Sequence, residues 1–207
     1  MRAAADAVGH EMRPVRPGSA APRVVVAAAI GLVIGVTWAA GLRAYMVALV
    51  GSASAFSWST LLSILLPGAI AGACVGAALA LHELGARRAW LLGFSPFAFT
   101  VLTLAEPGAL VALLTQGLGG GAIAVPAALV LGGFGFGSAG PRAVRVGCLA
   151  VALLIAAGVV ATVPIIGGPG LALSTPRGVW AAALAGGLLV SGMLGTALAF
   201  RPSQHRR

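Results

Sequence analysis

Six long runs of apolar residues occupy most of the chain and restrict how it can fold. A helix that rises 1.5 Å per residue needs about 20 apolar residues to cross about 30 Å of hydrocarbon. Each run is close to that length, and the runs are continuous instead of alternating, which favours helices over the strands of a membrane barrel. The runs lie at residues 24–42 (with a helix that can continue to Leu49), 60–81, 89–105, 118–137, 144–166 and 178–200.

The composition indicates that the solvent of this chain is lipid. Hydrophobic residues make up 59% of it, charged residues only 8%, and the mean hydropathy is +1.04. A soluble domain carries about 25% charged residues. The chain has 31 glycines, and small side chains let membrane helices approach closely. We therefore expect an all-α, polytopic bundle of about six transmembrane helices at residues 23–201.

The 13 basic residues are all arginine, and the net charge is +9. They lie in tails and short loops, so membrane lipids are the expected partners and nucleic acid is not. With the N-terminus in the cytoplasm, only Arg43 and Arg177 fall outside, and the other arginines lie on the cytoplasmic side. This positive-inside pattern predicts a plasma-membrane protein, at the inner membrane of a bacterium, with both termini in the cytoplasm.

The segments outside the runs are predicted to be tails and loops. Residues 1–22 are polar and predict a disordered cytoplasmic tail, and residues 202–207 predict a short basic one. The first run is longer than the 7–15 apolar residues of a signal peptide, so we expect an uncleaved helix. Residues 107–117 can form either an outer loop or a re-entrant helix, and the sequence leaves this open.

The outer ends of the first two runs carry aromatic residues and one charge. Arg43 falls about 28 Å along a helix from residue 24, which predicts a place at the outer interface. A long arginine side chain can extend from there to water. Aromatic rings settle at the same depth, and the predicted interface anchors are Trp38, Tyr45, Phe56 and Trp58.

A polar site is predicted near this outer face. Arg43 and Glu106 are the opposite charges expected there, and a pair between them would line an outer vestibule. Thr100 and Thr103 share a helix face below Glu106 and extend the predicted site. The alternative is that each charge only terminates its helix among the lipid head groups.

Glycines recur at a spacing of four residues in the first two runs. Gly68, Gly72 and Gly76 form one ridge, and Gly31 and Gly35 form another. Such ridges predict close helix packing, although a glycine-rich chain produces several of these pairs by chance.

No catalytic or metal-binding constellation is recognisable in the sequence. His10, His82 and His205 are expected in tails or in a loop, so no base is expected within a span. The segment GFGFGSAG, residues 133–140, lacks the glycine that a nucleophile elbow needs two residues before Ser138. We therefore predict no enzyme activity, no metal and no cofactor.

The segment RAYM, followed by AFSWSTLLSILLPG, resembles a group of uncharacterised integral membrane proteins of actinobacteria. In that group an arginine, an aromatic residue and a methionine close the first span, and an FSWS-like segment opens the second. The resemblance covers residues 36–76 and implies no function. The residues that carry it are Arg43, Tyr45, Met46, Phe56, Ser57, Trp58 and Ser59.

Two functional hypotheses follow. The first is a transport-type or small-molecule-binding protein without its own energy coupling, since no nucleotide motif and no acid at mid-membrane are expected. The alternative is a structural or accessory protein that packs against another membrane protein or a second copy of itself. The accessory hypothesis predicts a glycine ridge that faces lipid. The binding hypothesis predicts that this ridge is buried and that a polar cavity opens near Arg43 and Glu106.

Overall fold

The structure, a computed structural model, describes residues 20–51, 58, 61–111 and 120–201. The predictions for residues 1–19, Phe56 and residues 202–207 lie outside this part of the chain. Residues 20–22, which we assigned to the tail, begin the first helix instead. The tail prediction extended too far because Pro22 and Arg23 look like loop residues, yet neither prevents the first turn of a helix.

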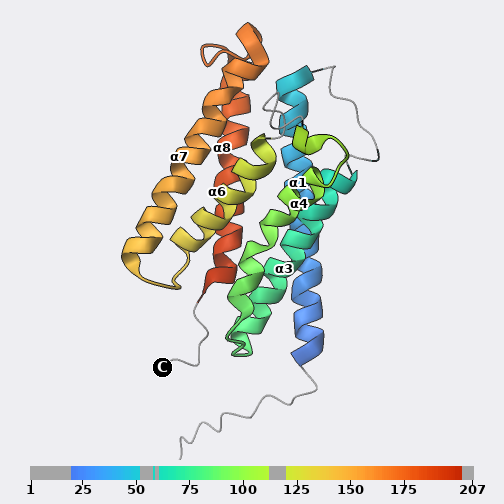
Figure 1. Ribbon diagram of the computed structural model, residues 1–207, viewed down its shortest axis with the longest axis vertical. Helices are drawn as coiled ribbons and strands as arrows, with labels where there is room; N and C mark the ends of the chain where they lie inside the picture. The colour runs from blue at the N-terminus through green and yellow to red at the C-terminus, as the bar shows by residue number, and fades with distance from the viewer. Residues whose placement is uncertain (1–19, 52–57, 59–60, 112–119, 202–207) are drawn as a thin grey trace, which may run out of the picture.

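The described residues form helices and no strands (Figure 1). Apolar runs without charges favour helices because a helix satisfies its own backbone hydrogen bonds in lipid. The elements in chain order are α1 (Ala20–Val50), the π-helical η3 (Leu61–Leu65), α3 (Leu66–Glu83), the 3₁₀-helical η4 (Ala89–Phe97), α4 (Ala98–Leu104), α6 (Gly120–Phe136), α7 (Arg142–Gly167), the 3₁₀ turn η5 (Gly168–Leu171), α8 (Pro176–Ala197) and the 3₁₀ turn η6 (Leu198–Phe200).

Local signals explain where two of these helices begin. Thr175 caps α8 by accepting a hydrogen bond from the backbone N–H of Gly178 at 3.1 Å, and Pro176 follows in the first turn. Gly140 has φ +88°, a left-handed conformation that suits glycine, and the chain turns there from α6 into α7.

Four helical segments are long and apolar enough to cross a membrane. They are Ala20–Val50, Leu61–Glu83, Arg142–Leu171 and Pro176–Phe200. Two further apolar helices, Ala89–Leu104 and Gly120–Phe136, are shorter. The structure therefore gives a membrane protein with four helices of spanning length among the described residues, and the prediction of six spans is not confirmed.

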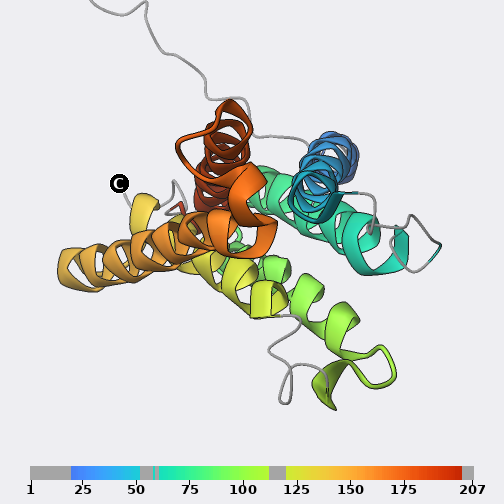
Figure 2. The same cartoon turned by 90° about the horizontal axis from the view of Figure 1, so that it is seen from above.

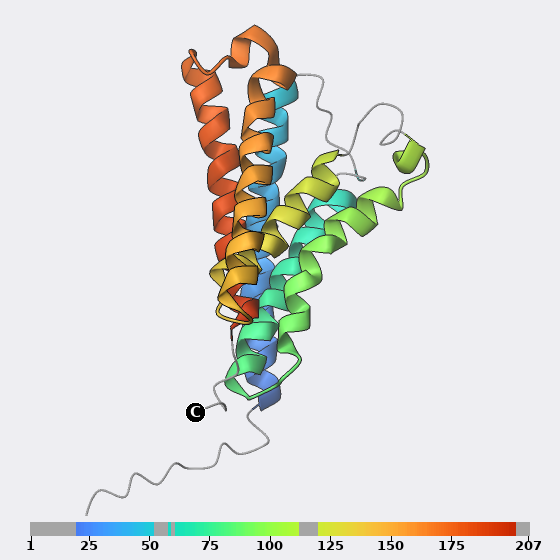
Figure 3. The ribbon, with the colours of Figure 1, turned by 60° about the vertical axis from the view of Figure 1, so that its left-hand side comes forward.

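The helices lie side by side but do not stay parallel. Figure 3 shows α1, α7 and α8 standing together while α3 and α4 lean away from them at one end, with α6 between the two groups. Seen from above in Figure 2, α7 and α8 flank one side and α4 ends farthest from them. The most extensive contacts join α1 to α3 and α6 to both α7 and α8. The bundle is therefore tight at one end and wide at the other.

Glycine backbones form the tight contact between α1 and α3. A Cβ atom added to Gly35 would lie 2.9 Å from the Cα of Gly72, and one added to Gly72 would lie 2.8 Å from the Cα of Gly35. Gly31 meets Gly72 and Gly76 in the same way, and Gly68 meets Gly35. All five predicted packing glycines thus lie at one crossing inside the chain, where the backbones can touch.

The segment GFGFGSAG, at the end of α6, forms a socket for Phe200. Phe200 is 1% exposed, and the backbone N–H groups of Ser138 and Ala139 donate hydrogen bonds to its carbonyl oxygen at 3.2 and 3.1 Å. Its ring packs edge-on against Phe94 and Phe134, with centroids 5.9 and 5.6 Å away. This contact ties η6 to α6 and η4, so the glycine motif has a packing role here.

Candidate functional site

A cavity of about 920 Å³ occupies the wide end of the bundle. Its walls come from the last turns of α1, from η3 and α4, from the first half of α6 and from the second half of α7. It exists because α3 and α4 lean away from α1 at this end (Figure 3). Glycines at the start of α6 and Gly158 on α7 present no side chains to fill it.

Four hydroxyl-bearing residues line an otherwise apolar wall: Tyr45, Ser63, Thr103 and Thr162. Tyr45 is 6% exposed, and its hydroxyl is buried without a hydrogen-bond partner among the described residues. Thr162 on α7 lines the same cavity. Thr162 itself donates to the carbonyl oxygen of Val159 at 2.7 Å, which leaves its oxygen able to accept. A buried hydroxyl without a partner is unfavourable, so this pair is the natural polar contact for a bound molecule.

The predicted polar site is only partly assembled. Thr103 lines the cavity, and the hydroxyl of Thr100 donates to the carbonyl oxygen of Ala122 at 2.7 Å, which joins α4 to α6 beside it. Arg43 and Glu106 do not line the cavity. Glu106 is exposed in the turn after α4, at the end of that helix farthest from α1 (Figure 3).

Arg43 is placed differently from the expected arginine that extends to water. Its side chain is only 9% exposed, and it has an interaction partner. Its neighbours in the sequence include Leu42 and Tyr45, which are both buried in one hydrophobic cluster. Arg43 is therefore packed within the protein. The sequence did not indicate this, because a residue at this distance along the helix can either extend to water or face the bundle.

The predicted interface anchors divide into two kinds. Trp58 is 81% exposed, as a ring at an interface would be. Trp38 instead points into the bundle, where its indole N–H donates to the carbonyl oxygen of Leu188 on α8 at 2.8 Å and its ring packs on Phe99. Tyr45 lines the cavity. Trp38 and Tyr45 are thus internal residues, because their rings find protein hydrogen bonds or packing instead of lipid head groups.

His82 is a further correction. It was expected in a loop, but it belongs to the last turn of α3 and is 6% exposed. Its Nε2 lies 2.7 Å from the carbonyl oxygen of Ala199, so the ring joins α3 to η6. His82 is therefore a packing residue at the tight end of the bundle. The apolar run that ends directly before His82 could have indicated that the helix continues through this residue. The end of α3 is covered by η6, which keeps water away from the His82 ring.

The described residues contain no group of three or more His, Cys, Asp or Glu side chains that could hold a metal ion. Cys74 and Cys148 are free thiols. The wall of the cavity carries hydroxyl groups but no charged side chain among its described residues. Its chemistry is suited to holding a neutral molecule by packing and by one or two hydrogen bonds.

The fold and the cavity place the chain in the class of all-α proteins with helices of membrane-spanning length and a partly open, mainly apolar cavity. Comparison with known protein families, with curated proteins and with solved structures found no match. The resemblance to actinobacterial membrane proteins stays a prediction.

Proposed function

We propose that the protein is a multi-pass plasma-membrane protein that binds a small, neutral, mainly apolar molecule in the cavity at the wide end of the bundle. It acts as a binding or transport-type protein without its own energy coupling. The cavity carries this proposal. Its volume of about 920 Å³ falls within the range of about 300–1,000 Å³ that ligand pockets occupy.

The chemistry of the wall supports a ligand with one or two hydrogen-bonding groups. Tyr45 on α1 and Thr162 on α7 offer a donor and an acceptor, and Thr103 on α4 adds a further hydroxyl. A charged ligand would lose its hydration without a counter-charge among the described lining residues. A hydroxyl or carbonyl group on an apolar body is therefore the expected ligand chemistry.

We also propose six spans with both termini in the cytoplasm. A 3₁₀ helix rises about 2.0 Å per residue, so η4 and α4 together extend about 28 Å. α6 extends about 26 Å at 1.5 Å per residue. Both lengths approach the hydrocarbon thickness of about 30 Å, and the distribution of arginines supports the orientation.

The accessory hypothesis is less well supported. It predicts a glycine ridge open to a partner helix, but Gly68, Gly72 and Gly76 pack against α1 of the same chain. That ridge is therefore occupied within one molecule.

Native mass spectrometry of protein purified in mild detergent tests the proposal. Gly158 lines the cavity, and a Cβ atom there would meet nothing within 4 Å, so Gly158→Phe fills the cavity without a backbone clash. Gly147→Phe is the matched control, because Gly147 lies on the same helix, also has open space, and does not line the cavity.

A small molecule that copurifies with the wild type and Gly147→Phe, and is reduced about tenfold or more in Gly158→Phe, supports the proposal. Equal retention in all three proteins would overturn it. Stoichiometric copurification of another membrane protein, with no small molecule, would favour the accessory hypothesis instead.

A further inference from the structure

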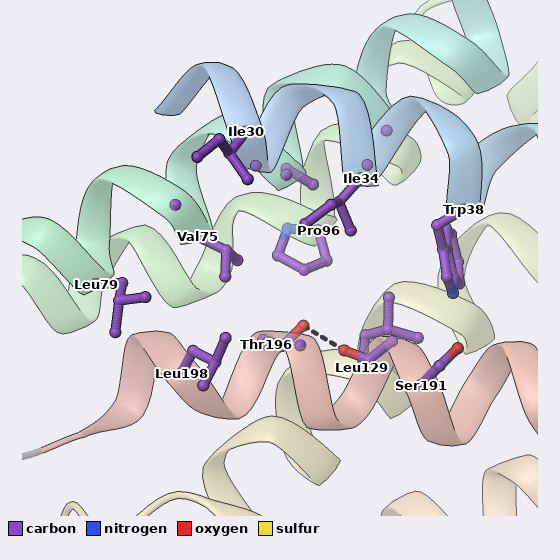
Figure 4. Close-up of a pocket in the computed structure, with 18 of the residues that line it drawn as sticks. Ile30, Ile34, Trp38, Val75, Leu79, Pro96, Leu129, Ser191, Thr196 and Leu198 are labelled. Carbon is purple, nitrogen blue, oxygen red and sulfur yellow. Dashed lines mark hydrogen bonds between the residues drawn. The ribbon is translucent and has the colours of Figure 1, made fainter. Parts of the chain in front are cut away.

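A second, narrower cavity lies between α1 and α8 and is separate from the proposed ligand cavity. Its volume is about 280 Å³. In Figure 4, α1 and α8 form its two sides, Val75 of α3 and Pro96 of η4 lie behind, and Trp38 stands at one end. Ile30 and Leu79 lie toward the other end. We call this cavity the α1–α8 groove.

The α1–α8 groove has an almost entirely apolar surface. Ser191 and Thr196 are its only hydroxyl-bearing lining residues among those described, and both hydroxyls already donate to carbonyl oxygens of α8, at 3.1 and 2.8 Å. Trp38 closes the groove at one end with its hydrogen bond to Leu188 of α8. The groove therefore offers no free donor and fits hydrocarbon.

The open end of the groove continues to a pair of opposite charges. A neighbouring cavity of about 450 Å³ shares Ile30 and Leu79 with the groove, and its lining includes Arg23 of α1 and Glu83 of α3. Both charged residues are exposed. The two cavities together form one path that is apolar for most of its length and ends at one cation and one anion.

The dimensions of this path match a lipid better than a helix. Arg23 and Trp38 are 15 residues apart on α1, or about 22 Å. One leaflet provides about 15 Å of hydrocarbon and about 5–7 Å of head-group region. A helix about 10 Å across would place only about 9 Å of its length, less than two turns, in the volume of the two cavities together.

We propose that this path binds one phospholipid whose head group carries both a phosphate and a primary ammonium, as phosphatidylethanolamine does. One acyl chain lies in the α1–α8 groove and ends at Trp38. The phosphate binds the guanidinium of Arg23, and the ammonium binds the carboxylate of Glu83. The pair of charges provides the selectivity for this head group. An acyl chain gains no hydrophobic free energy in the groove, because the lipid tails around the protein are equally apolar.

The test compares two lipids with identical acyl chains, dioleoyl phosphatidylethanolamine and dioleoyl phosphatidylglycerol, titrated onto delipidated full-length protein and followed by native mass spectrometry. We expect phosphatidylethanolamine to be retained in preference. Arg23→Gln and Glu83→Gln should each lower its retention about fivefold, since a charge near the head groups contributes about that much. The Glu83→Gln protein should also lose the preference over phosphatidylglycerol.

A groove-filling variant tests the acyl-chain position. Gly195 lines the groove and has open space for a Cβ atom, so Gly195→Leu should lower lipid retention about fivefold or more. Gly187→Leu is the matched control on α8, because Gly187 also has open space but does not line the groove. Thermal melts without lipid verify that both variants are folded.

Three results would overturn the proposal: equal binding of the two lipids by the wild type, a preference for phosphatidylglycerol, or unchanged retention in Gly195→Leu. The Gly158→Phe protein separates this site from the ligand cavity. It should keep its phosphatidylethanolamine, and a loss there would place the lipid in the ligand cavity and contradict the groove assignment.

Discussion

Helices α1 and α3 behave differently at their two ends. Around Gly31, Gly35 and Gly72 their backbones touch, and no space is left between them. At the other end the helices carry larger side chains, such as Leu42 and Leu49 on α1 and Ile64 of η3. The helices diverge there, and a cavity of about 920 Å³ lies between them. In a chain of nearly uniform hydropathy, side-chain size therefore decides where the helices touch and where they leave a cavity.

The largest effect is expected at the tight end. Gly72→Ala places a Cβ atom 2.8 Å from the Cα of Gly35 and also against the carbonyl oxygen of Gly31. These are backbone atoms, so the helices must separate, and we expect a loss of about 3 kcal/mol in the free energy of unfolding. Chemical unfolding in mild detergent measures it.

Gly147→Ala provides the control for this change. Gly147 lies in α7, and an added Cβ atom there meets nothing within 4 Å. The same substitution should then be neutral, or stabilise the helix by about 0.5–1 kcal/mol. If the two variants were equally stable, the tight crossing would not be the main contact between α1 and α3.

A smaller effect is expected at Trp38, which lies on α1 between the two regions. Trp38→Phe keeps an aromatic ring but removes the N–H that donates to Leu188 at 2.8 Å. The lost bond should lower the free energy of unfolding by about 1 kcal/mol. A thermal melt measures this, and an unchanged melting temperature would mean that the hydrogen bond does not hold α8 against α1.

The smallest effect, of opposite sign, is expected at the wide end. Tyr45→Phe removes a hydroxyl that is buried and without a partner among the described residues. The ligand-free protein should gain up to about 1 kcal/mol in its free energy of unfolding. The same variant should retain less of the ligand measured by native mass spectrometry. A Tyr45→Phe protein that is less stable and binds equally well would mean that the hydroxyl serves packing and not recognition.

Much of the helical architecture could be predicted from the apolar runs. The predicted run at residues 60–81 corresponds to the helical segment Leu61–Glu83, and the run at 144–166 corresponds to α7, Arg142–Gly167. The number of spans could not be settled in this way. The segment Ala89–Leu104 begins as a 3₁₀ helix, whose greater rise per residue is not encoded in the length of an apolar run.

Less of the candidate site could be predicted. Hydropathy marks which residues avoid water, but it does not distinguish a face toward lipid from a face toward protein. Trp38 and Tyr45 were therefore assigned to the interface, although they face the interior. Thr103 was predicted because it shares a helix face with Thr100 near Glu106, whereas Thr162 has no second polar residue nearby in the sequence.

The Phe200 socket has a consequence for the order of assembly during synthesis. Its walls, Phe94 and Phe134, are synthesised well before Phe200, so we expect the socket to be completed only after α8 has been synthesised. The carbonyl oxygen of Phe200 also accepts hydrogen bonds from the backbone N–H groups of Ser138 and Ala139. The docking of Phe200 therefore fills the socket and fixes the turn between α6 and α7 at the same time. The docking of α8 therefore completes the Phe200 socket, whereas the glycine crossing between α1 and α3 needs no residue of α8.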